Sequence, residues 1–214
     1  MRRILALLLS LIAIASPLAA QRPPRLDIAV PTATALKEGP AIVTEGLLSD
    51  AKTREHLRNG FPARIHYRLE LWRKSGVLSG DDRAGTLEWD VLVNYDPTAN
   101  VYNMVRRSSD DSYRENFGSL STLSSAEIQL AKPYKTSLHP TRSGRYYYNL
   151  TVEVETLAQS DLDATLQWLR GTTAPGKTSN PLTVIRSGVG TLFSRLLGGA
   201  QNKYEQPSEV FTVP

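Results

Sequence analysis

Cysteine is absent from all 214 residues, and its absence removes two kinds of chemistry together. Without thiols the chain forms no disulfide, and it has no thiolate to act as a nucleophile or to bind a metal ion. It also lacks the cysteine to which bacterial lipoproteins attach their lipid. The stability of the fold must therefore come from the burial of apolar side chains.

Histidine is scarce, and its positions do not suit a metal site. His56, His66 and His139 are far apart, and none has a partner at the short helical spacing of a zinc motif. No serine lies in the glycine-flanked turn of a hydrolase nucleophile. Gly171 to Thr178 has the letters of a phosphate loop, but this string lies in a proline-containing linker after a predicted helix. The sequence therefore predicts no catalytic residue, no metal and no cofactor.

The long apolar run of the chain lies at its N-terminus. Arg2 and Arg3 precede twelve mostly apolar residues from Ile4 to Ala15, and Ser16 to Ala20 adds a helix break and small residues. This pattern is typical of a cleavable secretory signal peptide over residues 1–20. An uncleaved anchor is the alternative, but twelve residues fall short of the roughly 20 that span a bilayer. We therefore expect an exported protein, periplasmic or secreted.

Excess charge of one sign is small. Residues 1–20 contain two arginines and no acid, so their removal lowers the formal net charge from +4 to +2. A charge so close to zero gives no electrostatic footprint for DNA or RNA. Nucleic acid is therefore not among the expected partners.

Alternation with a period of two predicts two long antiparallel strands between Phe61 and Tyr95. Since a slip of one residue would turn every apolar side chain outward, odd positions must pair with odd positions. We expect the even positions to face water, with Arg68 opposite Glu88 or Asp90 and with His66 near Asp90 as a surface pair. The apolar odd positions are Ala63, Ile65, Tyr67, Leu69, Leu71, Leu87, Trp89, Val91, Val93 and Tyr95.

Other segments complete an α+β pattern. Further strands are predicted over 26–30, 41–48, 101–106 and 145–157, with a last one through Val210 and Phe211, and helices over 50–58, 121–131, 162–170 and 184–197. The run 108–118 is interpreted as a polar connection. The sequence thus predicts an α+β protein with an antiparallel β-sandwich-like core and three or four short helices.

The same patterns divide the chain into four segments. We expect a signal peptide at 1–20, a β-rich envelope domain at 21–171, and a flexible linker at 172–183 rich in Thr, Gly, Pro and Ser. The last segment, 184–214, is predicted to be an amphipathic helix and a C-terminal tail. It would pack on the domain or on a partner.

The order of several motifs resembles a bacterial secreted envelope family of unknown function, the domain of unknown function 4390 type. The resemblance extends from about residue 26 to residue 171 and implies a small exported β-rich protein. The resemblance assigns no catalytic residue to any position of this chain. The motifs that support it are Leu57 to Pro62, Leu69 to Arg73, Val93 to Asp96, Ser160 to Asp163 and Trp168 to Gly171.

Two groups of apolar and aromatic residues are candidates for binding. A tyrosine triplet in the predicted strand 145–157 would pave a sugar-binding or peptide-binding face, or divide between core and rim. The apolar stripe of the predicted C-terminal helix would contact a membrane surface or a partner, or pack on its own sheet. The candidate binding surface consists of Tyr146, Tyr147, Tyr148, Leu192, Phe193 and Leu196.

These features predict a non-enzymatic binding or scaffold module of the envelope. Its partner would be an envelope protein, a polysaccharide or a membrane surface. The alternative is a periplasmic hydrolase that uses surface carboxylates, and Glu153 and Glu155 on one strand face are its candidates. The hydrolase hypothesis requires these two residues to line a concave pocket.

Overall fold

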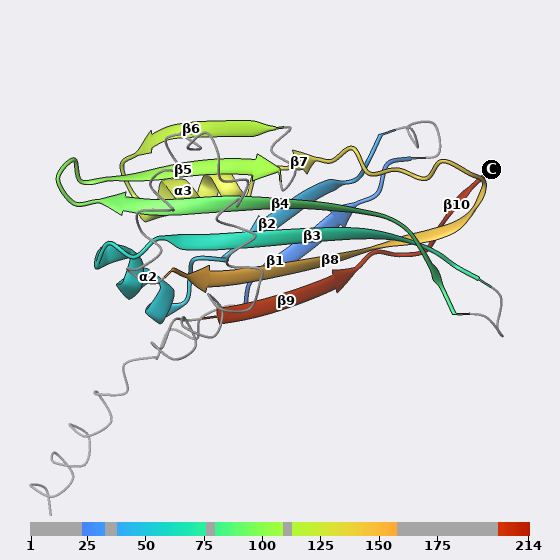
Figure 1. Ribbon diagram of the computed structural model, residues 1–214, viewed down its shortest axis with the longest axis horizontal. Coiled ribbons are helices and arrows are strands. Elements are labelled where there is room, and N and C mark those ends of the chain that lie inside the picture. The colour runs from blue at the N-terminus through green and yellow to red at the C-terminus, as the bar shows by residue number, and fades with distance from the viewer. Residues whose placement is uncertain (1–22, 33–37, 76–79, 109–112, 158–200) are drawn as a thin grey trace, which may run out of the picture.

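A computed structural model describes residues 23–32, 38–75, 80–108, 113–157 and 201–214, and these contain ten strands and two helices (Figure 1). More than half of the described residues lie in strands, and every paired strand is antiparallel to its neighbour. The predicted α+β class is confirmed. In chain order the elements are β1 (Arg25–Ala29), β2 (Ala41–Glu45), α2 (Ala51–Arg58), β3 (Ala63–Arg73), β4 (Asp82–Asp96), β5 (Val101–Ser108), β6 (Arg114–Leu120), α3 (Leu123–Leu130), β7 (Tyr134–Lys135), β8 (Gly144–Thr156), β9 (Gln201–Pro207) and β10 (Phe211–Val213).

The larger sheet has seven strands in the order β10, β8, β3, β4, β5, β6, and β9 also pairs with β8 (Figure 1). The strands β3, β4 and β5 pair in chain order and form a meander. Tyr67 pairs with Trp89, and Arg68 pairs with Glu88, so odd positions meet odd positions as predicted. On the other side of β3, Tyr67 pairs with Val152 of β8. The central hairpin is therefore confirmed, with odd positions opposite odd positions as far as Leu71 and Gly85.

Two strands of this sheet lie where the sequence predicts none. β6 falls largely within the run interpreted as a polar connection, and it forms along the free edge of β5. Gly118 takes a φ of 73° there, which accommodates a bulge in the strand. β9 has little apolar alternation, but its Lys203 lies opposite Glu153 of β8. Both strands form because they pair with a longer neighbouring strand. No local sequence pattern reveals that pairing.

The C-terminal tail belongs to the same sheet as the central hairpin. Both β9 and β10 pair with β8, and between them the N–H of Ser208 donates to the carbonyl of Tyr148 at 2.8 Å. Residues 201–213 therefore continue the sheet of the domain that was expected to end at residue 171. The linker expected over 172–183 lies outside the described residues.

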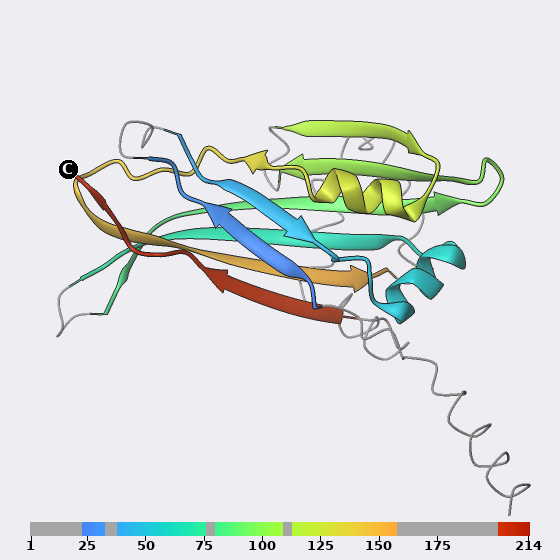
Figure 2. The same ribbon diagram turned by 180° about the vertical axis from the view of Figure 1, so that it is seen from behind.

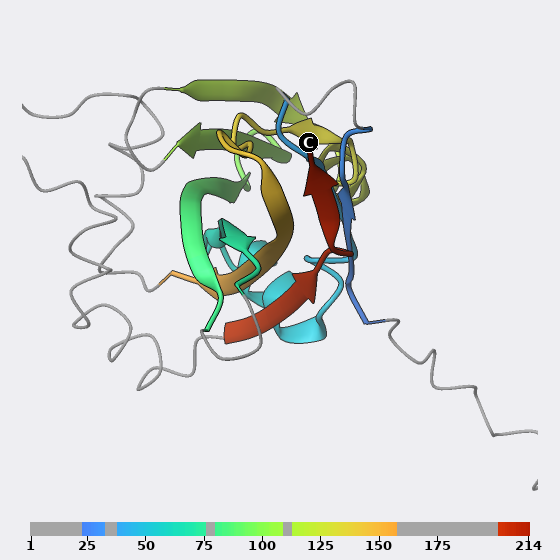
Figure 3. The ribbon, with the colours of Figure 1, turned by 90° about the vertical axis from the view of Figure 1, so that its right-hand side faces the viewer.

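The smaller sheet, in the order β1, β2, β7, lies across one face of the larger one. Figures 1 and 2 view the two sides, and β1 and β2 are in front of the larger sheet in Figure 2. β1 lies beside β9, and α3 packs beside β2. The view along the strands in Figure 3 shows β1 (blue) beside the C-terminal strands (red). We call the side of the larger sheet that faces away from the smaller sheet the outer face.

Both described helices begin after an N-cap residue whose side chain accepts a backbone N–H. The carboxylate of Asp50 accepts the N–H of Thr53 at 2.9 Å at the start of α2, and Thr122 caps α3 in the same way. These helices match the ones predicted over 50–58 and 121–131. The remaining two predicted helices, over 162–170 and 184–197, lie outside the described residues.

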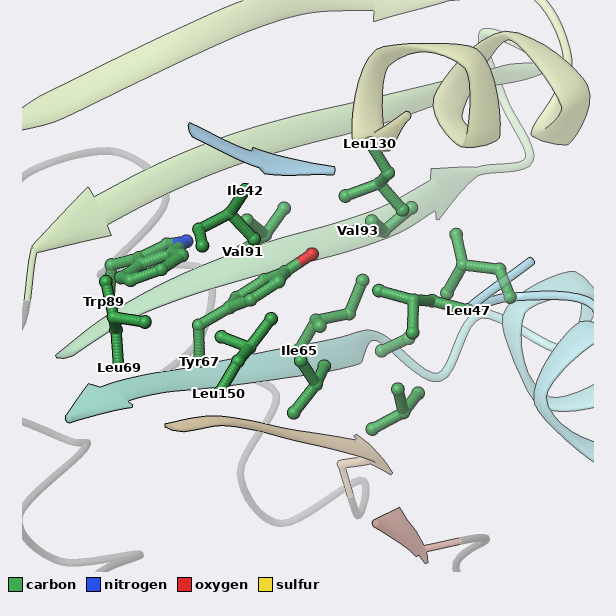
Figure 4. Close-up of a cluster of buried hydrophobic side chains, with 14 of the residues drawn as sticks. Ile42, Leu47, Ile65, Tyr67, Leu69, Trp89, Val91, Val93, Leu130 and Leu150 are labelled. Atoms are coloured by element: carbon green, nitrogen blue, oxygen red, sulfur yellow. The ribbon is translucent and has the colours of Figure 1, made fainter. Parts of the chain in front are cut away.

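The core lies between the two sheets, and an aromatic stack is at its centre. The ring of Trp89 stacks on Tyr67 with the centroids 4.8 Å apart, and it contacts Tyr134 of β7 at 5.0 Å. The Tyr67 hydroxyl and Thr44 Oγ1 are 3.2 Å apart. Figure 4 shows the rings of Trp89 and Tyr67 among aliphatic side chains of β3, β4 and β8. The smaller sheet thus covers the apolar face that a hairpin alone would expose.

Candidate functional site

The outer face carries two clusters of side chains at different points along β3. Charged residues gather near the start of β3, beside α2, and aromatic residues lie near its end. The two clusters differ in burial, and this difference decides what each of them can do.

Arg64 is the centre of the charged cluster. Its Nε lies 2.7 Å from Asp90 Oδ1, and its Nη1 lies 2.8 Å from Glu155 Oε1. His66 Nδ1 lies 3.0 Å from the same oxygen of Asp90. Three adjacent strands supply these groups, because long side chains reach opposite and diagonal neighbours across an antiparallel sheet. We call Arg64, His66, Asp90 and Glu155 the ion network.

The predicted pair of His66 and Asp90 exists, but the prediction that it lies on the surface is wrong. Asp90 is 1% exposed and Arg64 is 9% exposed, so this part of the polar face is not in water. Charges tolerate burial when they are paired and hydrogen-bonded. Period-two alternation identifies the polar face, but it does not show that charges on three strands neutralise one another.

The ion network favours the ionised form of Asp90. Burial alone opposes the negative charge, but the hydrogen bond with His66 and the positive charge of Arg64 outweigh it. Together they hold the pKa of Asp90 below its usual value. Burial likewise works against the charge of Arg64, but Asp90 and Glu155 raise its pKa above the ordinary one.

Low pH is expected to destabilise the fold because it protonates the carboxylate of Asp90. A carboxylate whose pKa is lower in the folded state stabilises the protein fully above its unfolded pKa of about 3.9, and this contribution disappears as the pH falls through the folded pKa. The free energy of unfolding should therefore drop below about pH 4. Asp90→Asn should show a shallower drop in urea titrations over this window. Identical slopes for the two proteins would contradict this assignment.

The two carboxylates of the hydrolase hypothesis are both in ion pairs. Glu155 is 7% exposed and bound to Arg64, whereas Glu153 lies 3.9 Å from Lys203 Nζ. Lys203 also pairs with Glu205 at 2.9 Å. Within the described ranges, no group of three or more His, Asp or Glu side chains could hold a metal ion. The candidate acid pair is thus engaged by basic side chains.

The three predicted tyrosines do not share a face. Tyr146 and Tyr148 are 3% and 1% exposed and belong to the core, as the core-and-rim alternative states. Tyr147 has the opposite parity and lies on the outer face. The other candidate residues lie outside the described part of the chain, namely Leu192, Phe193 and Leu196.

Tyr147 forms part of the second cluster on the outer face. Its direct cross-strand partner is Trp72 of β3, and both side chains are half-buried. Glu70 accepts the indole N–H of Trp72 at 3.2 Å with one carboxylate oxygen, and Arg83 Nη1 at 3.1 Å with the other. Lys74 Nζ lies 5.8 Å from the centroid of the Tyr147 ring. We call Glu70, Trp72, Lys74, Arg83 and Tyr147 the aromatic platform.

A β-bulge brings Arg83 to the aromatic platform. Leu71 pairs with Gly85, but the next residue, Trp72, pairs with Arg83, so Ala84 is the additional residue in β4. Bulges of this kind redirect side chains at the ends of strands. The pairing explains how Arg83 reaches the carboxylate of a residue on β3.

The Tyr147 phenol is also held in place. Partial burial and then the hydrogen bond with Asp81 raise the pKa of Tyr147 above its usual value. Asp81 Oδ1 in turn accepts the N–H of Ser75 at 3.3 Å. Both rings of the platform thus have polar partners that fix their orientation.

Sequence reasoning missed Trp72, although a signal was present. The even positions of β3 before it are arginine, histidine, arginine and glutamate, so a tryptophan on this parity breaks the polar pattern. Tyr147 similarly lies on the parity of Asn149, Thr151 and Glu153. Large aromatic residues at positions otherwise reserved for polar side chains mark the platform.

Comparisons with known proteins add no assignment. No family model, curated protein or solved structure matches the chain. The resemblance to the envelope family therefore stays a prediction. In the described part of the chain, no helix is both long and apolar enough to cross a membrane.

Proposed function

We propose that the chain is an exported, non-enzymatic binding module of the bacterial envelope. The N-terminal pattern of arginines, apolar run and small residues supports export. The two packed sheets support a sandwich-like scaffold that holds its side chains rigidly. The observation that carries the proposal is the placement of Trp72 and Tyr147 side by side, half-buried, on two central strands.

An aromatic pair in this position is suited to recognition. Tyrosine and tryptophan offer a large contact area with few rotatable bonds, so ordering them on binding costs little conformational entropy. Residues on strands are also held more precisely than residues on loops. Because Glu70 already orients the indole of Trp72, the surface is preorganised for a partner.

The chemistry of the platform distinguishes between classes of partner. Glu70 and Asp81 are acidic, whereas Lys74 and Arg83 are basic, so the charges close to the two rings balance. A surface without excess positive charge gives little attraction to nucleic acid. An envelope protein, a polysaccharide and a membrane surface are the partners that fit an exported module.

Co-sedimentation of residues 21–214 with isolated envelope fractions tests the proposal. We expect the protein to bind to one of three fractions: cell-wall polysaccharide, membrane vesicles or membrane protein. The double variant Trp72→Ala/Tyr147→Ala should lose most of this binding, because it removes both rings. The matched control is Tyr113→Ala, since Tyr113 is an exposed aromatic residue next to β6, away from the platform. Equal binding by the double variant and the wild type would refute the proposal.

A further inference from the structure

We infer that the aromatic platform binds a neutral, hydroxyl-rich glycan chain, an inference that rests on the binding function proposed above. Trp72 and Tyr147 are direct partners on adjacent strands, so their side chains leave the sheet on the same side. The face of an aromatic ring carries negative electrostatic potential. It therefore attracts the weakly positive C–H groups that cover one side of a sugar ring.

The polar groups around the rings match hydroxyls better than they match ions. Glu70 and Asp81 accept hydrogen bonds, whereas Lys74 and Arg83 donate them. A phosphate or another anion would meet two carboxylates, and a cation would meet two basic groups. A sugar hydroxyl donates and accepts, so it can satisfy both kinds of group without an unfavourable charge contact.

The side chains that border the platform can adjust to such a ligand. Lys74 and Arg83 are exposed, and the Arg83 side chain is 57% exposed even in its pair with Glu70. Because one partner of this ion pair is largely solvated, the pair contributes little stability, and exchanging the Arg83 contact for a ligand contact costs little. Lys74 has a flexible stem that can move off the ring of Tyr147 and donate to a hydroxyl.

The location of the platform favours a polymer over a single sugar. The two rings lie on a sheet surface, and such a surface covers less of a small ligand than a cleft does. A chain compensates by placing successive sugar units on successive side chains, so that each further contact is made at high effective concentration. Affinity should therefore rise with the length of the glycan.

Titration calorimetry with soluble oligosaccharides tests the inference on residues 21–214. The probes are β-1,4-linked glucose oligomers, β-1,4-linked N-acetylglucosamine oligomers and α-1,4-linked glucose oligomers of two, four and six units. Polygalacturonate and phosphatidylglycerol vesicles are the anionic comparisons. We expect at least one neutral series to bind with affinity that increases with length, and Trp72→Ala to weaken it by about tenfold or more. Trp72→Phe should retain most of the affinity, and Tyr113→Ala should retain all of it.

The outcomes separate this inference from the function on which it rests. Binding of a neutral series that depends on Trp72 and Tyr147, with unchanged thermal unfolding of the variants, supports the glycan. Binding only to polygalacturonate or to vesicles overturns it, and so does the absence of binding to every neutral oligomer. If the protein still binds an envelope fraction through the platform, the glycan inference alone fails. If no fraction binds either, both proposals fail.

Discussion

Replacement of Trp89 by alanine is expected to lower the free energy of unfolding by about 3 to 5 kcal/mol. Trp89 is 2% exposed and lies at the centre of the core. Its ring stacks on Tyr67 of the neighbouring strand and contacts Tyr134, which belongs to the smaller sheet. The substitution therefore leaves a cavity and removes a ring contact between the two sheets. Both effects lower the free energy of unfolding.

A second tryptophan provides the matched control for this experiment. Trp72 lies on the adjacent strand but is half-buried on the outer face, so Trp72→Ala removes the same side chain without opening the core. We expect this control to cost about 1 kcal/mol or less. Urea unfolding followed by far-ultraviolet circular dichroism measures both variants. Similar losses for the two variants would show that the core is not centred on Trp89.

Much of the fold can be predicted from the local sequence pattern, because the burial of apolar side chains on one face of each strand dominates it. In the central hairpin most apolar side chains share one parity, with Trp72 and Leu92 as exceptions, so a single register turns that set toward the core. The same rule places Tyr146 and Tyr148 in the core and Tyr147 outside it. The helix caps at Asp50 and Thr122 are equally local, because each is a contact between residues three apart.

The remaining features depend on neighbours that are distant in sequence. β6 and β9 form because β5 and β8 offer them backbone partners, and neither strand has a strong alternation of its own. The aromatic platform is similar, since it requires the knowledge that Trp72 and Tyr147 are opposite each other. Such pairings become visible only when the order of the strands is known. Parity alone, however, would have marked Trp72 as unusual.

The polar face shows the limit of period-two reasoning. Alternation correctly separates the two sides of β3, but it gives the same prediction for Arg64 as for Arg68. In the structure Arg64 is buried between two carboxylates, whereas the side chain of Arg68 is 43% exposed beside Glu88. This difference in burial leads to very different expectations for two substitutions on one strand.

Arg64→Ala is expected to cost about 3 to 5 kcal/mol of stability, because it leaves Asp90 and Glu155 buried without their cation. Arg68→Ala, four residues along the same strand, should cost about 1 kcal/mol or less, since the Arg68 side chain is 43% exposed and already partly solvated in the folded protein. Urea unfolding at neutral pH compares the two variants with the wild type. A loss for Arg64→Ala no larger than that for Arg68→Ala would mean that the ion network does not stabilise the fold.

The pH dependence of the stability lost in Arg64→Ala tests whether unpaired buried charge causes the loss. This test does not depend on how large the loss is. With Arg64 removed, burial opposes the charge of Asp90 with only His66 left to offset it, so Asp90 should bind a proton more readily. Protonation removes the unpaired charge. The stability difference between Arg64→Ala and the wild type should therefore shrink as the pH falls toward about 4. A cavity left by the arginine stem would instead give a difference that does not change with pH.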